Sequence, residues 1–78
     1  MKIVFTKHAK DMLNLRGIKK TQVRKCLQKP DKILPAKFGK KAYLKDFGKN
    51  YLKVIVSEEM KNKAIVTLYW LDKKRVKM

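Results

Sequence analysis

Apolar residues recur with two different periods along this chain. Between residues 9 and 27 they fall every three or four positions, as at Ala9, Met12 and Leu13, whereas beyond residue 40 they fall at every second position. The first spacing places apolar side chains on one side of a helix, and the second places them on one face of a strand. The pattern therefore predicts helices in the first part of the chain and a sheet in the second.

A first helix is predicted over residues 7–16, after a short β-prone run at residues 3–5. Thr6 precedes this helix and can cap its N-terminus, and Gly17 follows it with the left-handed freedom that ends helices. A second helix of about ten residues follows Ile18 and is closed by Pro30, which cannot continue a helix. The two helices form a hairpin joined at residues 16–18.

Strands are predicted over residues 40–46, 51–57 and 63–71, separated by turns at 47–50 and 58–62. Residues 32–36 predict a weaker first strand, because Pro35 interrupts it. The order of elements is β-α-α-β-β-β, which indicates an α+β domain. We expect the helical hairpin to pack on one face of a small antiparallel sheet, since such a sheet can leave its other face in water.

The strand alternation assigns side chains to the two faces of this sheet. The face expected to meet the helices carries Ala42, Leu44, Leu52, Val54, Val56, Val66 and Leu68, against Met12, Leu13, Leu15, Val23 and Leu27. The opposite face is expected to carry Tyr43, Lys45, Tyr51, Lys53, Thr67 and Tyr69. Cations beside aromatic rings are the combination that binds single-stranded RNA, through phosphates and bases respectively. A structural interpretation stays open, because Tyr and Thr are common strand residues and Lys is common on solvated surfaces.

Charge sharpens this picture. The 78 residues contain 22 Lys and Arg against 6 Asp and Glu, which gives a net charge of +16 and a pI of about 10.2. Such a balance favours a polyanionic partner, most of all nucleic acid. All but three of the cations are lysines, which favours contacts to phosphates over reading of bases. Hydrophobic residues make up 45% of the chain, enough for one core, so residues 1–78 are expected to form a single domain with a short basic C-terminal tail.

Several classes of protein are excluded by the composition. A single cysteine, Cys26, allows no internal disulfide, and one His with one Cys cannot build a zinc site. The glycines are scattered, so no glycine-rich phosphate loop is present, and we expect neither a metal nor a cofactor. No apolar run is long enough to span a membrane, and residues 1–5 do not begin the apolar segment of a signal peptide, so we expect neither feature. We expect a cytoplasmic protein that does not bind membranes.

Short segments in both halves of the chain form a combined pattern. They are His8-Ala9, Arg16-Gly17-Ile18, Val23, Leu27, Pro30, Leu52-Lys53-Val54-Ile55 and Val66-Thr67-Leu68-Tyr69-Trp70. This pattern resembles the DUF4258 family, which is similar to the RelE/ParE superfamily of toxin–antitoxin systems. The resemblance implies a RelE-like fold and a metal-independent endoribonuclease toxin that acts on mRNA, free or bound to ribosomes. It also implies a small acidic antitoxin as a partner.

Cleavage of RNA without a metal needs a base, an acid and cations that stabilise the extra charge on the phosphate. The candidate catalytic residues are Lys53, Tyr69, Arg75 and His8, and the candidate nucleic-acid-binding residues are Lys45, Lys53, Tyr43, Lys73 and Lys74. Lys45, Lys53, Tyr69 and Arg75 are of the residue types that the resemblance implies, whereas His8 is a candidate because it is the one histidine. The alternative is a non-catalytic module of the same fold that binds nucleic acid or a protein.

Overall fold

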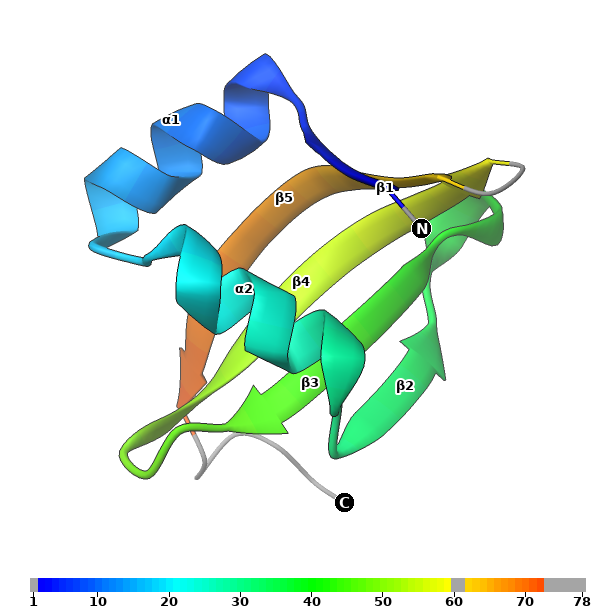
Figure 1. The fold of residues 1–78 in the computed structure, drawn as a ribbon. Coiled ribbons are helices and arrows are strands. Elements are labelled where there is room, and N and C mark those ends of the chain that lie inside the picture. The colour runs from blue at the N-terminus through cyan, green and yellow to red at the C-terminus, as the bar shows by residue number, and fades with distance from the viewer. Residues whose placement is uncertain (1, 60–61, 73–78) are drawn as a thin grey trace.

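The chain folds into a five-stranded sheet with two helices packed on one face (Figure 1). The structure is a computed structural model that describes residues 2–59 and 62–72. In chain order the elements are β1 (Lys2–Phe5), α1 (Lys7–Arg16), α2 (Lys20–Gln28), β2 (Lys32–Pro35), the 3-10 turn η1 (Lys37–Gly39), β3 (Lys41–Asp46), β4 (Asn50–Glu59) and β5 (Asn62–Asp72). This arrangement confirms an α+β fold with two successive helices between the first strand and the others.

The sheet is mixed, so the expectation of an antiparallel sheet is wrong at one edge. The strand order is β1-β5-β4-β3-β2, and β1 runs parallel to β5 while every other neighbouring pair is antiparallel. Turns between successive strands force antiparallel pairing, but the direction of β1 is set by the crossover through both helices. The weak strand expected near Pro35 is a full edge strand, β2, and an edge tolerates a proline at its end.

The helix boundaries follow from the capping residues that the sequence shows. The Thr6 hydroxyl accepts a bond from the Ala9 backbone N–H at 3.2 Å and donates to the Ile65 carbonyl at 2.7 Å. One side chain therefore caps α1 and ties it to β5. At the other end Gly17 has φ of 63°, a left-handed conformation that glycine adopts without strain, and its N–H bonds to the Leu13 carbonyl.

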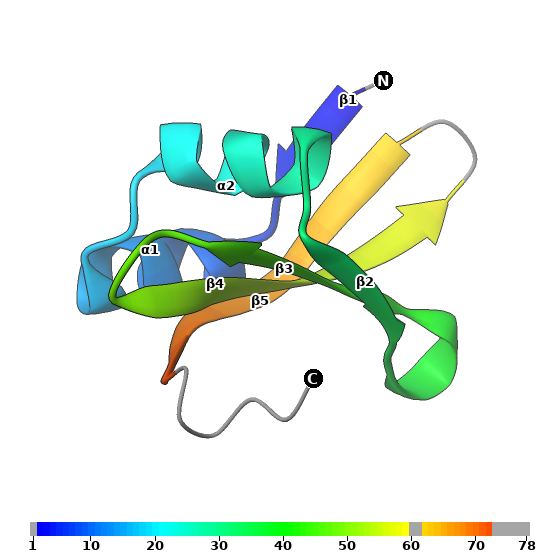
Figure 2. The same ribbon diagram turned by 90° about the horizontal axis from the view of Figure 1, so that it is seen from below.

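The two helices lie differently on the sheet. α2 crosses the middle of one face, which we call the helix face, whereas α1 packs against β5 (Figures 1 and 2). β1 pairs with β5 only as far as Ile65, and beyond that point the end of α1 is held to the strand. There the indole Nε1 of Trp70 donates to the Arg16 carbonyl at 3.2 Å. The end of α1 is thereby fixed beside β5.

The hydrophobic core lies between the helices and the helix face. Its buried members are Ala9, Leu13, Ile18, Val23, Cys26, Leu27, Tyr43, Leu52, Val54, Val56, Ile65 and Leu68. Met12 packs partly against them, but Leu15 is 73% exposed, so its expected place in the core is wrong. The reason is the phase of the helix: Leu13 and Ala9 are four residues apart and point at the sheet, and Leu15, two residues after Leu13, lies on nearly the opposite side of the helix.

The expected faces of β3 are reversed. Tyr43 pairs with Val54 and so lies on the helix face, whereas Ala42 and Leu44 lie on the opposite face, which we call the far face. All three side chains are buried, with Tyr43 only 3% exposed. A strand that is buried on both sides gives no polar alternation from which its orientation can be inferred.

A β-bulge also reverses part of β5. Ile55 pairs with Thr67 but the next residue, Val56, pairs with Ile65, so Val66 is an extra residue on β5. An extra residue shifts the alternation by one position. Ile65 therefore belongs to the core and Val66 lies on the far face, the reverse of the expected order.

Candidate nucleic-acid interface

A groove on the far face joins the β2–β3 connection to the sheet. Its volume is about 620 Å³, and its lining is Leu34, Pro35, Ala36, Lys37, Phe38, Lys40, Ala42, Lys53, Ile55, Val66 and Tyr69. The floor is apolar, and three lysines and two aromatic rings stand around it. No acidic residue is among these lining residues, so the groove is a concave basic surface suited to an anionic chain.

Tyr69 lies beside two cations on this face. It pairs directly with Lys53 across β4 and β5, and the Lys53 Nζ lies 5.6 Å from the centre of the Tyr69 ring. The Arg16 guanidinium reaches the same ring from the end of α1, with its Cζ 5.9 Å from the ring centre. Both distances are typical of cation–π contacts. The expectation that Lys53 and Tyr69 share a face is therefore confirmed.

Arg16 is a member of this cluster that the sequence reasoning did not assign to the site. In the sequence it is only the last residue of a helix before a glycine. Its approach to Tyr69 depends on the packing of α1 beside β5, which the bond from Trp70 to the Arg16 carbonyl maintains. No spacing in the sequence carries this information, because residues 16 and 69 are brought together by tertiary packing alone.

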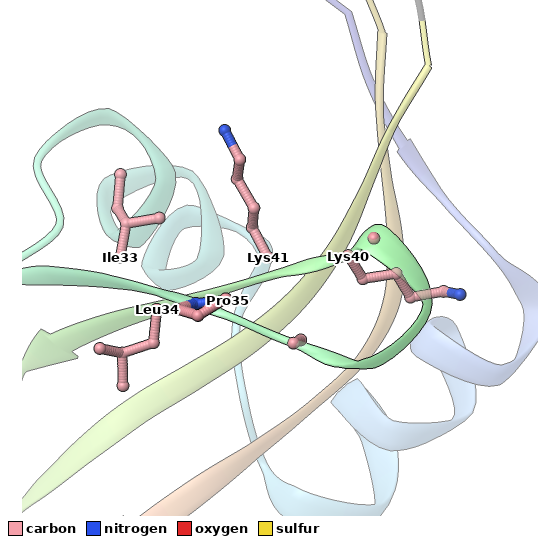
Figure 3. Close-up of a pocket in the computed structure, with 7 residues that line it drawn as sticks. Ile33, Leu34, Pro35, Lys40 and Lys41 are labelled. Atoms are coloured by element: carbon pink, nitrogen blue, oxygen red, sulfur yellow. The ribbon is translucent and has the colours of Figure 1, made fainter.

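The β2–β3 connection forms the other end of the groove. Figure 3 shows a neighbouring pocket at this connection, where the side chains of Ile33 and Leu34 point to opposite sides of β2. Leu34 lines the groove, and Phe38 and Lys40 follow it in the η1 segment. The Lys40 Nζ lies 5.4 Å from the centre of the Phe38 ring. A second pairing of cation and ring thus stands at the opposite end of the groove from Tyr69.

Two of the candidate binding residues lie away from this groove. Lys45 is on the helix face, where its Nζ donates to the Lys29 carbonyl at the end of α2 at 3.0 Å. The Tyr43 hydroxyl donates to Glu58 Oε1 at 2.5 Å and accepts from Lys63 Nζ at 2.9 Å. The bond from Tyr43, together with nearby lysines, lowers the pKa of the Glu58 carboxyl. The shared face proposed for Lys45 with Lys53 and Tyr69 is therefore wrong, and Tyr43 joins a polar network at the end of the sheet.

The remaining candidates divide between one placed residue and three outside the described residues. His8 is exposed in the first turn of α1, at the opposite end of that helix from Arg16. Eight residues of helix separate the two by roughly 12 Å along the axis. The structure therefore does not bring His8 to Tyr69. Lys73, Lys74 and Arg75 lie beyond the part of the chain that the structure describes.

Cys26 is placed for packing. Its side chain is fully buried between α2 and the sheet, and its Sγ donates weakly to the Tyr43 and Leu52 carbonyls at 3.5 and 3.6 Å. Burial raises the pKa of this thiol to about 12, so it stays protonated at neutral pH and is a poor nucleophile. Within residues 2–59 and 62–72, no group of three His, Cys, Asp or Glu side chains could hold a metal ion. The described helices are also too short and too polar to cross a membrane.

These features define a small α+β protein with two helices on one face of a mixed sheet and a basic groove on the other. The DUF4258 model, described as a domain of unknown function, matches residues 5–70. The chain belongs to this family, and the resemblance noted from the sequence is confirmed to that extent. Neither a curated protein nor a solved structure matches it.

Proposed function

We propose that this protein binds RNA through the groove on its far face. The observation that carries the proposal is a groove whose lining has lysines and no acidic residue, in which Lys53 lies beside the Tyr69 ring. Arg16 is not a lining residue, but its guanidinium reaches the same ring from the end of α1. Lysines and arginine supply contacts to phosphates, and the aromatic rings offer surfaces on which bases stack. The net charge of +16 adds long-range attraction for any nucleic acid.

Cleavage of the bound RNA is a second candidate function, favoured by the two cations beside the Tyr69 phenol. In a metal-independent reaction the 2′-oxygen of a ribose attacks the adjacent phosphorus, the bond to the 5′-oxygen breaks, and a cyclic phosphate forms. A base removes the proton of the 2′-hydroxyl and an acid protonates the leaving 5′-oxygen. The Tyr69 hydroxyl is the candidate acid, and Lys53 with Arg16 would stabilise the added charge on the phosphate. His8 is too far along α1 to serve beside them.

This candidate corresponds to a toxin of the RelE/ParE kind that acts on mRNA, free or ribosome-bound. The order of two helices between a first strand and the remaining strands supports that relationship. A small acidic antitoxin would then be the natural partner, because its charge complements the basic groove. A protein of the same fold that binds a target without cleaving it is the alternative, and the catalytic assays below separate the two.

Binding is tested by fluorescence anisotropy with a labelled single-stranded RNA. We expect Lys53→Ala and Arg16→Ala each to weaken binding, and Lys25→Ala, which removes the same charge from α2 on the helix face, to have a smaller effect. If about six phosphates are contacted, affinity should fall roughly 300-fold between 50 and 200 mM salt. A salt-independent affinity, or an equal loss in all three variants, would contradict binding through the groove.

Cleavage is tested with free RNA in the presence of EDTA and, separately, with RNA on ribosomes in the Mg²⁺ buffer that keeps them intact. Tyr69→Phe keeps the ring and removes the hydroxyl, so it should leave affinity nearly unchanged and abolish cleavage. Cleavage that survives in Tyr69→Phe would exclude the phenol as the acid. Binding by the wild type with no cleavage under either condition would leave the binding module as the function.

A further inference from the structure

Phe38 combines two properties that are costly for a large apolar residue. Its side chain is 91% exposed, and its backbone has φ of 60°, the one positive value among the described residues other than glycine. A left-handed backbone is strained for a residue with a bulky side chain, and strain of this kind gathers at functional sites. Phe38 also lies outside the hydrophobic core, so packing in the core does not explain it.

The ring of Phe38 lies where a nucleic-acid strand in the groove would meet it. Phe38 lines the groove together with its neighbours Lys37 and Lys40, and Lys40 lies 5.4 Å from the ring centre. Tyr69 lines the same groove from β5, with β3 and β4 between the two rings. The groove thus has an aromatic ring from each side and the Lys53 cation between them.

We propose that Phe38 is a base-stacking residue and that the groove takes single-stranded RNA in preference to a duplex. This inference rests on the proposed RNA binding and specifies its substrate class. In an A-form duplex the faces of the bases are covered by their neighbours, so an exposed ring finds no surface to stack on. An unpaired base has a free face, and stacking tolerates any base sequence. The flanking lysines then hold the phosphates on either side of the stacked base.

The test compares two substitutions at Phe38 by anisotropy with an eight-nucleotide single strand and a duplex of the same length. Phe38→Asn removes the ring and is compatible with the positive φ at this position, because Asn adopts the left-handed conformation more readily than most residues. Phe38→Tyr keeps a ring. We expect Phe38→Asn to weaken single-strand binding roughly ten- to hundredfold, the range that loss of one stacked base gives, and Phe38→Tyr to stay close to the wild type. As a control, Leu15→Ala truncates an exposed apolar residue elsewhere, on α1, and should leave single-strand affinity unchanged.

The outcomes separate this inference from the function on which it rests. Single-strand binding that is lost in Lys53→Ala but kept in Phe38→Asn would overturn the stacking role and would leave RNA binding in place. Equal affinity for single strand and duplex would overturn the substrate preference. Absence of RNA binding by the wild type at low salt would overturn both. Thermal melts of each variant check that a loss of affinity is not a loss of fold.

Discussion

The bulge on β5 makes a sharp prediction about two adjacent residues. Regular alternation would put Val66 in the core and Ile65 on the far face, whereas the bulge places Ile65 in the core with no exposed surface. We therefore compare Ile65→Ala and Val66→Ala. The two substitutions are one position apart on the same strand and have similar effects on strand propensity. The difference between their losses of unfolding free energy therefore reports the difference in burial.

The magnitude follows from the buried methyl and methylene groups. Ile65→Ala removes three carbons, which at about 0.8 kcal/mol each gives ~2.4 kcal/mol of lost transfer free energy. Incomplete collapse of the cavity raises the expected cost to about 3–4 kcal/mol. Val66 is half-buried beside the groove, so its truncation should cost about 1 kcal/mol or less.

The assay is urea unfolding followed by circular dichroism. A domain of this size has roughly 4–12 kcal/mol of stability, so Ile65→Ala could leave too little folded protein to measure. Ile65→Val, expected to cost about 0.5–1.5 kcal/mol, provides the milder version and should lower the melting temperature by roughly 2–12 °C. A larger cost for Val66→Ala than for Ile65→Ala would refute the bulge and restore regular alternation.

Three further predictions concern other parts of the fold. Thr6→Ala should cost about 1–2 kcal/mol in urea unfolding because it removes the cap of α1, and Thr6→Ser should keep most of that stability. Burial raises the folded pKa of Cys26 from 9.0 to about 12. The contribution of this thiol to the free energy of unfolding is therefore complete below pH 9. It is lost as pH rises toward 12, by at most ~1.4 kcal/mol per pH unit. The wild type should therefore lose more stability than Cys26→Ala between pH 8 and pH 10, and equal losses would contradict the burial. Tyr43→Phe should lower stability by about 1 kcal/mol, through loss of the bonds to Glu58 and Lys63, and should leave RNA affinity unchanged.

Much of the secondary structure is determined by local features of the sequence. The helix over residues 7–16 is predictable because Thr6 and Gly17 act on the backbone within one turn of themselves. The strands are predictable because side chains alternate along an extended chain whatever its partners are. The positive charge is likewise a property of the composition alone. These features gave the α+β class and the expectation of an anionic partner before any tertiary contact was known.

The faces of the strands and the members of the groove were decided by tertiary structure. Tyr43 looked like a surface residue, but β3 is buried on both sides and its phase is set by pairing with β4. Val66 changed face because one extra residue on β5 shifts the alternation, and a bulge of this kind has no signal in a run of apolar residues. The expected faces of Tyr43 and Val66 were both wrong because polar residues do not alternate with apolar ones in these parts of the strands.

The groove shows the same division between local and long-range causes. Lys53 and Tyr69 could be expected on one face because they lie on strands that follow each other in the chain, but their direct pairing depends on the register shift at the bulge. Arg16 and Phe38 could not be expected at this site, because Arg16 reaches the Tyr69 ring through the packing of α1 beside β5, and Phe38 reaches the groove through the path of the β2–β3 connection. Residues near in sequence, or linked by one hairpin, constrain each other through the backbone. Residues that meet across elements do so only when the whole sheet and its helices are assembled, so the composition of this site is a property of the fold.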